Sequence, residues 1–428
     1  MVVRIDEPLA IEGGPKAVQL PFVDRWEAVG DDEIAAVTAL MTAVREKRRG
    51  WYDILDEFEA EFASFVGTRY ALAHSNGTAT IHAAIFAAGV RSGDEVVVPS
   101  YTWHASITPI LHCGGTPVYC DIDPLTFTAD PADIERKISP RTKAIVVTHV
   151  FGNPAKMDDI VSIARAHGLV VIEDASHAHG ATYDGAAVGS LGDIGCFSLQ
   201  ASKSVSAVEG GMATTSDPNL YDQMLVLGHY GRIQKKLATD AFRDLHDVGL
   251  GVKYRANPLG VAMAQAQLRR LPELNEKRLA WFDRLNAALT DLRGFRPQQV
   301  YPKAQRGGLL LYTGMFDPDI TGIPTPTILK ALIAEGIDCQ PGITPFGYGQ
   351  MHREPALSDF SFAGFGGPWG SAGGDNRRVY PAGSLPASER LHANAFWMQT
   401  LVDPSPELLD QVSLAFHKVM RNLDRLRS

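Results

Sequence analysis

The sequence contains few cysteines and no long apolar segment. Its four cysteines form no CxxC pair, so the spacing indicates neither a zinc site nor a disulfide scaffold. No apolar run approaches the roughly 20 residues of a membrane helix. The N-terminal stretch "MVVRIDEPLAIEGGPK" lacks the basic start and apolar core of a signal peptide. We therefore expect reduced thiols, a cytoplasmic location and no membrane partner.

Charge of either sign is never concentrated along the chain. The 428 residues include 40 Lys and Arg against 49 Asp and Glu, a formal net charge of −9, which gives no reason to expect a nucleic-acid partner. With 45% hydrophobic and 21% charged residues, the composition is that of a folded globular protein. This length accommodates a large domain with a smaller partner domain, and small molecules are the expected ligands.

Short β-rich runs alternate with helical patterns after two amphipathic helices expected at residues 31–48 and 55–67. The alternation predicts an α/β fold with a mostly parallel sheet and helices on both faces. The β-runs are "YALAH", "EVVVPS", "PVYCDI", "KAIVVTHV" and "LVVIEDA", and the helical stretches are "TATIHAAIFAAG", "HASITPILHCG", "DPADIERKI" and "MDDIVSIARAHG".

Changes in sequence texture divide the chain into three expected parts. These are an N-terminal segment over 1–50, a large domain over 51–290 and a small C-terminal α+β domain over 291–428. The Gly-rich and aromatic stretch 361–385 reads as a long loop, either a lid or a plain surface loop.

A single lysine stands out in "CFSLQASKSVSAVEGG", residues 196–211. Lys203 lies among small and hydroxyl side chains, a setting that a surface lysine does not need. A lysine that must lose its proton to attack a carbonyl does need a partly desolvated position.

Polar residues close several of the predicted strands, where ligands bind in parallel sheets. Gly77 and Thr78 follow the first strand and begin a helix, where backbone N–H groups and a hydroxyl suit a phosphate, although helix capping alone also explains them. Trp103 is placed to stack on a flat ring or to pack between helix and sheet. Ser198, near Gln200, offers a second hydroxyl for the phosphate or is an ordinary strand-end serine.

Asp174 ends the most apolar strand, in "VVIEDASHAHG". A carboxylate here suits a protonated pyridine nitrogen, and the simpler alternative is a helix N-cap. His177 is placed to face a phenolic oxygen. Together with Lys203 and a phosphate cup, these residues indicate pyridoxal 5′-phosphate as cofactor. A rival interpretation, ranked lower, makes Asp174, His177 and His179 a metal cluster.

The same motifs, in this order, resemble the DegT family of sugar aminotransferases among fold-type I pyridoxal-phosphate enzymes. The resemblance begins near "GWYDILDEFEAEFASFVGTRYALAHSNGTAT", includes "GDEVVVPSYTW" and "THVFGNPAKMDDI", and fades after about residue 270. It implies a homodimer with shared active sites, in which Lys203 forms the Schiff base and Asp174 pairs with the ring nitrogen. It also implies that His177 faces the phenolic oxygen, that Trp103 stacks, and that Gly77, Thr78 and Ser198 hold the phosphate.

One departure concerns the G-x-N-x-R motif, whose Asn crosses the dimer interface to the phosphate in the family. This chain reads "GVKYRANPLG", with Lys253 at the Asn position and Asn257 nearby. An ammonium is able to take over that role as a point charge, so either residue is a candidate for it.

The expected function is transfer of an amino group from L-glutamate or L-glutamine to a keto-sugar, nucleotide-linked or not, or to a keto-cyclitol. Such a reaction belongs to amino-sugar or antibiotic biosynthesis. Two alternatives stay open: a catalytically silent regulatory protein on the same fold, and a metal-dependent hydrolase. Arg232 and His229, in "GHYGRIQKK", are interpreted as exposed loop residues and stay outside the site.

Overall fold

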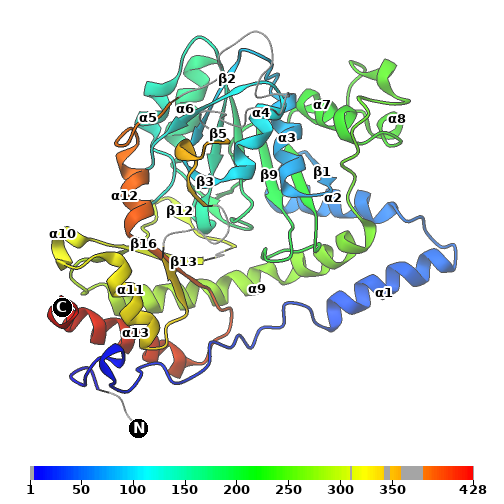
Figure 1. Ribbon diagram of the computed structural model, residues 1–428. Coiled ribbons are helices and arrows are strands. Elements are labelled where there is room, and N and C mark those ends of the chain that lie inside the picture. Colours follow the sequence, from blue (N-terminus) through cyan, green and yellow to red (C-terminus); the bar gives the residue numbers. More distant parts are fainter. Residues whose placement is uncertain (1–3, 309–310, 342–347, 358–378, 428) are drawn as a thin grey trace.

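The computed structural model describes residues 4–308, 311–341, 348–357 and 379–427. At its centre is a seven-stranded sheet (Figure 1). The strands from β9 to β4 run parallel to their neighbours, whereas β10 is antiparallel to both β9 and β1. In sheet order the strands are β1 (Tyr70–His74), β10 (Gly211–Thr215), β9 (Ile194–Ser198), β6 (Val170–Asp174), β5 (Thr142–Thr148), β2 (Glu95–Pro99) and β4 (Thr116–Cys120).

Helices cover both faces of this sheet, as the sequence predicts. Val96 and Val98 of β2 pack into one hydrophobic cluster with helices α3, α4 and α7, whereas Val97 between them packs into another with α5 and α6. Successive side chains of a strand point to opposite faces, so continuous apolar runs form strands buried on both sides. The helices are α3 (Gly77–Ala87), α4 (Thr108–His112), α5 (Pro131–Lys137), α6 (Met157–His167) and α7 (Pro218–Gly228).

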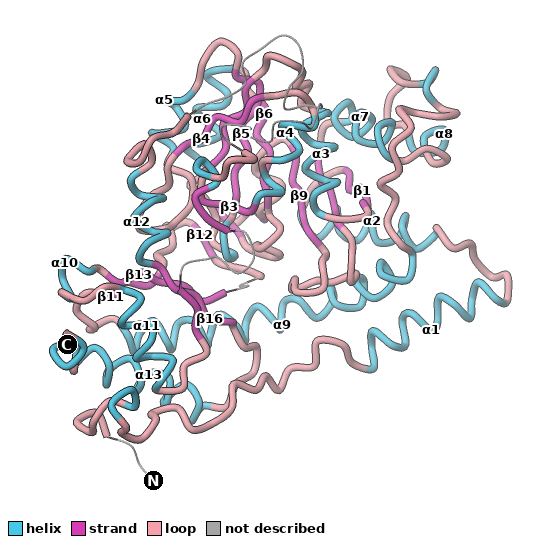
Figure 2. Tube along the Cα trace, in the orientation of Figure 1, coloured by secondary structure: helices cyan, strands magenta, loops and turns pink. Residues whose placement is uncertain are grey.

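A long helix, α9 (Pro258–Leu289), connects the large sheet to the rest of the chain. It passes below the sheet and reaches α13 (Pro406–Arg421) in Figure 1. Its first half packs against α2 (Asp53–Val66) and α1 (Asp31–Arg45), and α1 lies at the periphery in Figures 1 and 2. Both predicted N-terminal helices are therefore present, and Gly67 ends α2 in the left-handed conformation.

A second, antiparallel sheet is formed by the C-terminal part of the chain. Its strands, in order, are β11 (Phe295–Pro297), β13 (Leu311–Phe316), β16 (Ala395–Gln399) and β14 (Cys339–Pro341). Helices α11 (Thr325–Ala334) and α13 share one hydrophobic cluster with this sheet and the second half of α9. Leu9 and Val18 belong to the same cluster, and the Lys418–Glu335 ion pair, 3.0 Å long, is fully buried beside it.

Smaller elements complete the described chain. They are β3 (Tyr101–Trp103), β7 (Thr182–Tyr183), β8 (Ala186–Ala187), α8 (Ile233–Lys236), β12 (Ala304–Gln305), α10 (Pro318–Thr321), β15 (Tyr348–Gln350), α12 (Pro386–Asn394) and six short 3-10 helices. Residues 361–378 of the expected Gly-rich loop lie outside the described residues.

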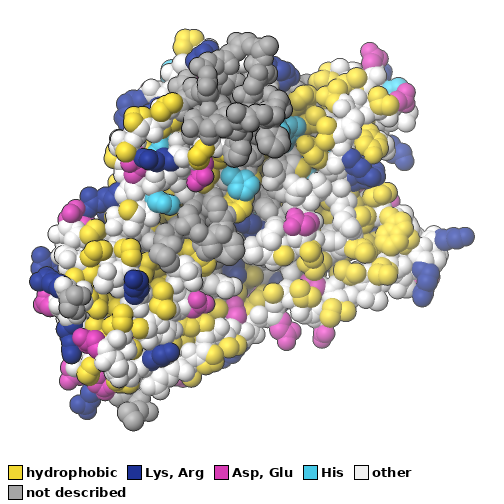
Figure 3. All heavy atoms as spheres, in the orientation of Figure 1, with side chains coloured by type: hydrophobic (Ala, Val, Ile, Leu, Met, Phe, Trp, Pro, Cys, Tyr) yellow, Lys and Arg dark blue, Asp and Glu magenta, His cyan; other side chains and the backbone are white. Residues whose placement is uncertain are grey.

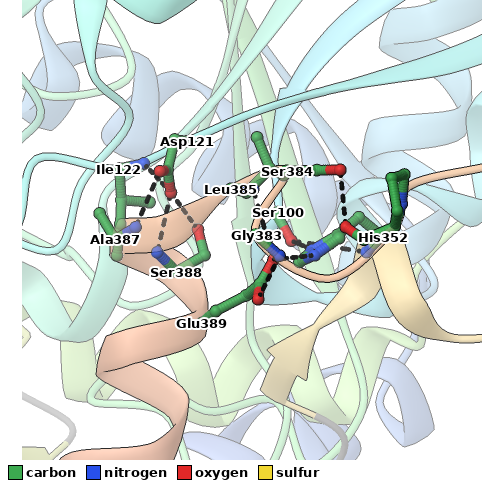
Figure 4. A network of polar contacts seen from close by, with 11 residues as sticks. Ser100, Asp121, Ile122, His352, Gly383, Ser384, Leu385, Ala387, Ser388 and Glu389 are labelled. Atoms are coloured by element: carbon green, nitrogen blue, oxygen red, sulfur yellow. Dashed lines mark hydrogen bonds and ion pairs between the residues drawn. The ribbon is translucent and has the colours of Figure 1, made fainter.

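Polar contacts tie the C-terminal part to the ends of the central strands (Figure 4). Asp121, just after β4, accepts hydrogen bonds from the Ala387 and Ser388 N–H groups and so caps α12. Ser100, just after β2, lies 2.5 Å from Nδ1 of His352. These contacts, with the pairing of β15 to β3, fix the chain beside Trp103.

Arg232 and His229 are buried, so their interpretation as exposed loop residues is wrong. Arg232 is 8% exposed and donates to both carboxylate oxygens of Glu59, at 2.8 and 2.6 Å, and to Asp56. His229 is 1% exposed and lies edge-on to His74. Neither residue lines the cavity described below, so both belong to the packing around α2.

On the face drawn in Figure 3, basic and acidic side chains are interspersed with apolar ones. Within the described ranges, no helix has the length and hydropathy that a membrane crossing requires.

Candidate active site

A cavity of about 960 Å³ opens at the carboxyl edge of the central sheet. Seven of the eight predicted cofactor-binding residues line it, and Lys253 does not. Those seven are Gly77, Thr78, Trp103, Asp174, His177, Ser198 and Lys203. The strands that carry them are parallel or precede a helix in the same sense, so their ends meet at one edge.

One end of the cavity is suited to a phosphate. Helix α3 begins at Gly77, with the Asn76 side chain accepting from the Ala79 N–H at 2.8 Å. The N–H groups of Gly77 and Thr78, in the first turn, have no acceptor within the helix. A Cβ at Gly77 would lie 2.7 Å from that of Ser198, so only glycine lets the serine hydroxyl approach this helix end. Backbone donors and hydroxyls thus converge where an anion binds best.

Asp174 holds a buried carboxylate against the cavity wall. It is 5% exposed; Oδ2 accepts from Ser106 Oγ at 2.6 Å, and Oδ1 accepts from the Ser176 N–H at 3.2 Å. Ser106 continues through Thr102 to Thr148 in a chain of hydroxyl contacts of 2.8 Å. No helix starts at Asp174, so the N-cap interpretation does not apply. Its charge faces the cavity with fixed orientation.

Lys203 lies in the turn after β9, where its N–H donates to the Gln200 carbonyl at 2.8 Å. Burial lowers the pKa of Lys203 to about 8, and nearby Asp174 opposes this shift. The amine is therefore neutral for a substantial fraction of the time at mildly alkaline pH, as a nucleophile toward a carbonyl requires. This is the setting that the sequence predicts for Lys203.

His177 packs with its ring stacked on Phe151 at 5.9 Å, and the Phe151 N–H points to its Nδ1 at 3.4 Å. Burial, reinforced by Lys203 and His179, holds the pKa of His177 well below its ordinary value. The imidazole is therefore neutral, so one of its two nitrogens carries a proton that it is able to donate.

His179 does not join Asp174 and His177 around a common point. It is absent from the cavity lining and faces Phe197, with ring centroids 5.5 Å apart. Burial lowers its pKa to about 3. Among the described residues, no three His, Cys, Asp or Glu side chains are placed to hold a metal ion.

Lys253 is exposed, and its backbone forms an isolated bridge with His229. Asn257 caps α9, its side chain accepting from the Leu259 N–H at 3.0 Å. Gln200 does line the cavity and binds the Ser202 N–H at 2.9 Å.

Several cavity residues have no counterpart in the sequence analysis. Asp24, Trp26 and Glu33 come from the N-terminal segment, and Trp397 and Thr400 come from β16 and the residue after it. Five more come from one face of α9: Met263, Gln267, Arg270, Leu274 and Arg278. Their helical spacing is visible in the sequence, but it does not reveal which face meets the cavity.

The sheet order, the phosphate cup and the Lys203–Asp174 pair together define a fold-type I enzyme that uses pyridoxal 5′-phosphate. The chain belongs to the DegT/DnrJ/EryC1/StrS aminotransferase family, whose model matches residues 28–358.

Individual relatives act on two kinds of substrate. The chain is 32% identical to the L-glutamine:2-deoxy-scyllo-inosose aminotransferase of Streptoalloteichus tenebrarius, over 98% of this chain and 99% of that protein. It is 37% identical to the GDP-perosamine synthase of Caulobacter vibrioides, over 72% and 81% respectively. The crystal structure of 3-amino-5-hydroxybenzoic acid synthase superposes with a TM-score of 0.77 at 26% identity, covering 95% of this chain and 100% of that one.

Proposed function

We propose that this enzyme transfers the amino group of L-glutamine or L-glutamate to the ring ketone of a cyclitol. The observation that carries the proposal is the pairing, in one cavity, of a partly neutral Lys203 with a buried, oriented Asp174. Pyridoxal 5′-phosphate, when bound, supplies an aldehyde for the lysine amine and a ring that delocalises the electrons left by proton removal.

Each site residue has a definite task in this proposal. Gly77, Thr78 and Ser198 hold the phosphate at the start of α3, and Trp103 stacks on the ring. Asp174 keeps the ring nitrogen protonated through its fixed negative charge, and the neutral His177 donates to the phenolic oxygen.

Lys203 then acts as the base. Once the donor amine has displaced it, its neutral Nζ takes the proton from the α-carbon of the donor and returns it on the opposite side of the new C–N bond. The keto acid leaves, and the acceptor ketone undergoes the same steps in reverse.

The balance of charge in the cavity favours a neutral cyclitol over a nucleotide-linked sugar as acceptor. Four carboxylates line the described cavity, whereas its cations are Lys203, Arg270 and Arg278. Arg270 is already paired with Glu33 at 2.8 Å. A sugar nucleotide brings two further negative charges, for which these residues provide little compensation. The S. tenebrarius relative, matched over almost its whole length, is named for an inosose.

We also propose a homodimer in which Lys253 of a second copy reaches the phosphate. Lys253 is exposed and absent from the cavity of its own chain, whereas Asn257 is occupied as a helix cap. A cytoplasmic location fits the four cysteines, all of which are free thiols.

The first test is the visible absorbance of the purified protein before and after addition of L-glutamine or L-glutamate. A yellow protein that bleaches, with a Lys203→Ala control that neither shows that colour nor bleaches, supports the first half-reaction. Keto-cyclitols and nucleotide-linked keto-sugars are then compared as acceptors. A yellow protein that neither amino donor bleaches would instead favour the regulatory alternative.

Mixing two inactive variants tests the dimer. A heterodimer of Lys203→Ala and Lys253→Glu chains contains one intact site only if Lys253 acts across the interface. Equal mixing after unfolding and refolding should then restore about a quarter of the wild-type activity. No restoration would place Lys253 outside the partner's site.

A further inference from the structure

Helix α9 presents two arginines to the cavity, and their charges are treated differently. Arg270 donates to Glu33 at 2.8 Å, and Glu33 is 1% exposed. The guanidinium of Arg270 also lies over the Trp26 ring at 4.5 Å. Its charge is therefore compensated within the protein.

Arg278 has no such compensation. Its Nη1 donates to Ser204 Oγ and to the Gly308 carbonyl, both at 2.7 Å, and neither acceptor carries a charge. Its Nε is buried without a hydrogen-bond partner. No carboxylate of the described chain lies within 4.0 Å of this guanidinium, and burial lowers the pKa of Arg278 to about 10.

Asp24 is the acid that most influences Arg278, and it is already occupied. Its carboxylate accepts from the N–H groups of Trp26, Val402 and Asp403, at 3.1, 2.7 and 2.9 Å. A largely buried cation without a partner is costly, so such a residue in a cavity marks a site for an anion.

The position of Arg278 identifies which anion fits. Its contact Ser204 follows Lys203 directly, and consecutive Cα atoms are about 3.8 Å apart. Arg278 and Lys203 also line the same cavity. An anion held by Arg278 therefore lies next to the reactive amine, away from the phosphate cup at Gly77 and Ser198.

We propose that Arg278 binds the α-carboxylate of the amino donor, an inference that rests on the proposed transamination. The carboxylate is attached to the carbon that loses its proton, so the planar fork of Arg278 would orient that carbon toward Lys203. Nη1 is held by Ser204 and Gly308, which leaves the remaining donors of the fork for the ligand. A keto-cyclitol has no carboxylate, so Arg278 separates donor from acceptor in a shared cavity.

The test compares two amines in single-turnover bleaching of the cofactor. One is L-glutamine and the other is 4-aminobutanamide, which is glutamine without its α-carboxylate. Wild-type protein should react far faster with glutamine. In Arg278→Gln, the ratio of the two second-order rate constants should fall by about tenfold to hundredfold, the effect of losing a charge-assisted contact. Equal losses for both amines, with an unchanged ratio, would overturn the inference.

Calorimetric binding of glutaramate, which has the carboxylate but no amine, gives a readout without turnover. Its dissociation constant should rise by a similar factor in Arg278→Gln. Arg284→Gln is the matched control, because Arg284 lies on the same helix and pairs with Asp410 at the surface. An equal effect of the control on either readout would contradict a local role for Arg278.

The two proposals fail in different ways. If neither amine bleaches the wild-type protein, transamination is excluded, whereas loss of glutaramate binding in Arg278→Gln still supports a carboxylate site. Equal glutaramate binding by both proteins overturns that site. If Arg278→Gln melts early, Arg278→Lys keeps the charge without the fork, and an unchanged rate ratio there refutes the inference.

Discussion

The depressed pKa of Lys203 has a consequence for stability that is measurable without any substrate. The change considered is Lys203→Met in the apoenzyme, which keeps the length of the side chain and removes its titration. Lowering the pKa of Lys203 from its ordinary 10.5 to about 8 corresponds to about 3 kcal/mol, at about 1.4 kcal/mol per pKa unit.

The sign follows from which state binds the proton. Below pH 8, Lys203 is protonated in both the folded and the unfolded protein, so the folded state carries the full cost of a buried ammonium. Between pH 8 and 10.5 the folded protein has released the proton and the unfolded protein keeps it. The cost therefore disappears as pH rises through this window.

Lys203→Met should melt above the wild-type apoenzyme at pH 7, and the gap should narrow with increasing pH. For a chain of 428 residues, 3 kcal/mol corresponds to roughly 3 °C. At pH 9.5 about 1 kcal/mol, or roughly 1 °C, should remain. Other groups titrate equally in both proteins and cancel in the difference. A gap in melting temperature that is the same at pH 7 and pH 9.5 would refute a depressed lysine pKa.

Two further substitutions separate function from stability. Asp174→Asn should lower the rate of bleaching by L-glutamine roughly 100-fold or more, because the charge is lost, while the Ser106 contact survives and the melting temperature changes by less than about 2 °C. A parallel loss of rate and stability would argue against an electronic role. Arg232→Leu should cost about 3–5 kcal/mol in thermal unfolding, because it leaves Glu59 buried and unpaired, whereas Arg269→Gln, in an exposed pair, should cost less than about 1 kcal/mol. Equal costs would contradict the burial of the first pair.

The elements of the large sheet are predictable because their sequences leave few alternatives. A run such as that of β5 is apolar at every position but one, is bounded by turn residues and is too short for a buried helix. The residues that end such strands must converge, which is why the sequence alone places Asp174 and Ser198 in one site.

Other features depend on contacts between distant parts of the chain. Nothing around Asp24 or Trp26 shows that residues 24–33 border the cavity, because they are held there by the Val402 N–H and by Arg270. Charged residues usually lie at the surface, so the sequence favours an exposed Arg232. Its burial depends on Glu59, 173 positions earlier in the chain.

The charges of the described cavity also explain why a lysine at position 253 is compatible with the family's phosphate site. Lys203 gives up its charge or uses it near Asp174, Arg270 is paired with Glu33, and we assign Arg278 to the donor carboxylate. The phosphate cup of one chain then consists of N–H groups and hydroxyls alone. A cation from a second copy supplies the missing charge, so cofactor affinity should depend on dimer formation more strongly than a neutral asparagine would require.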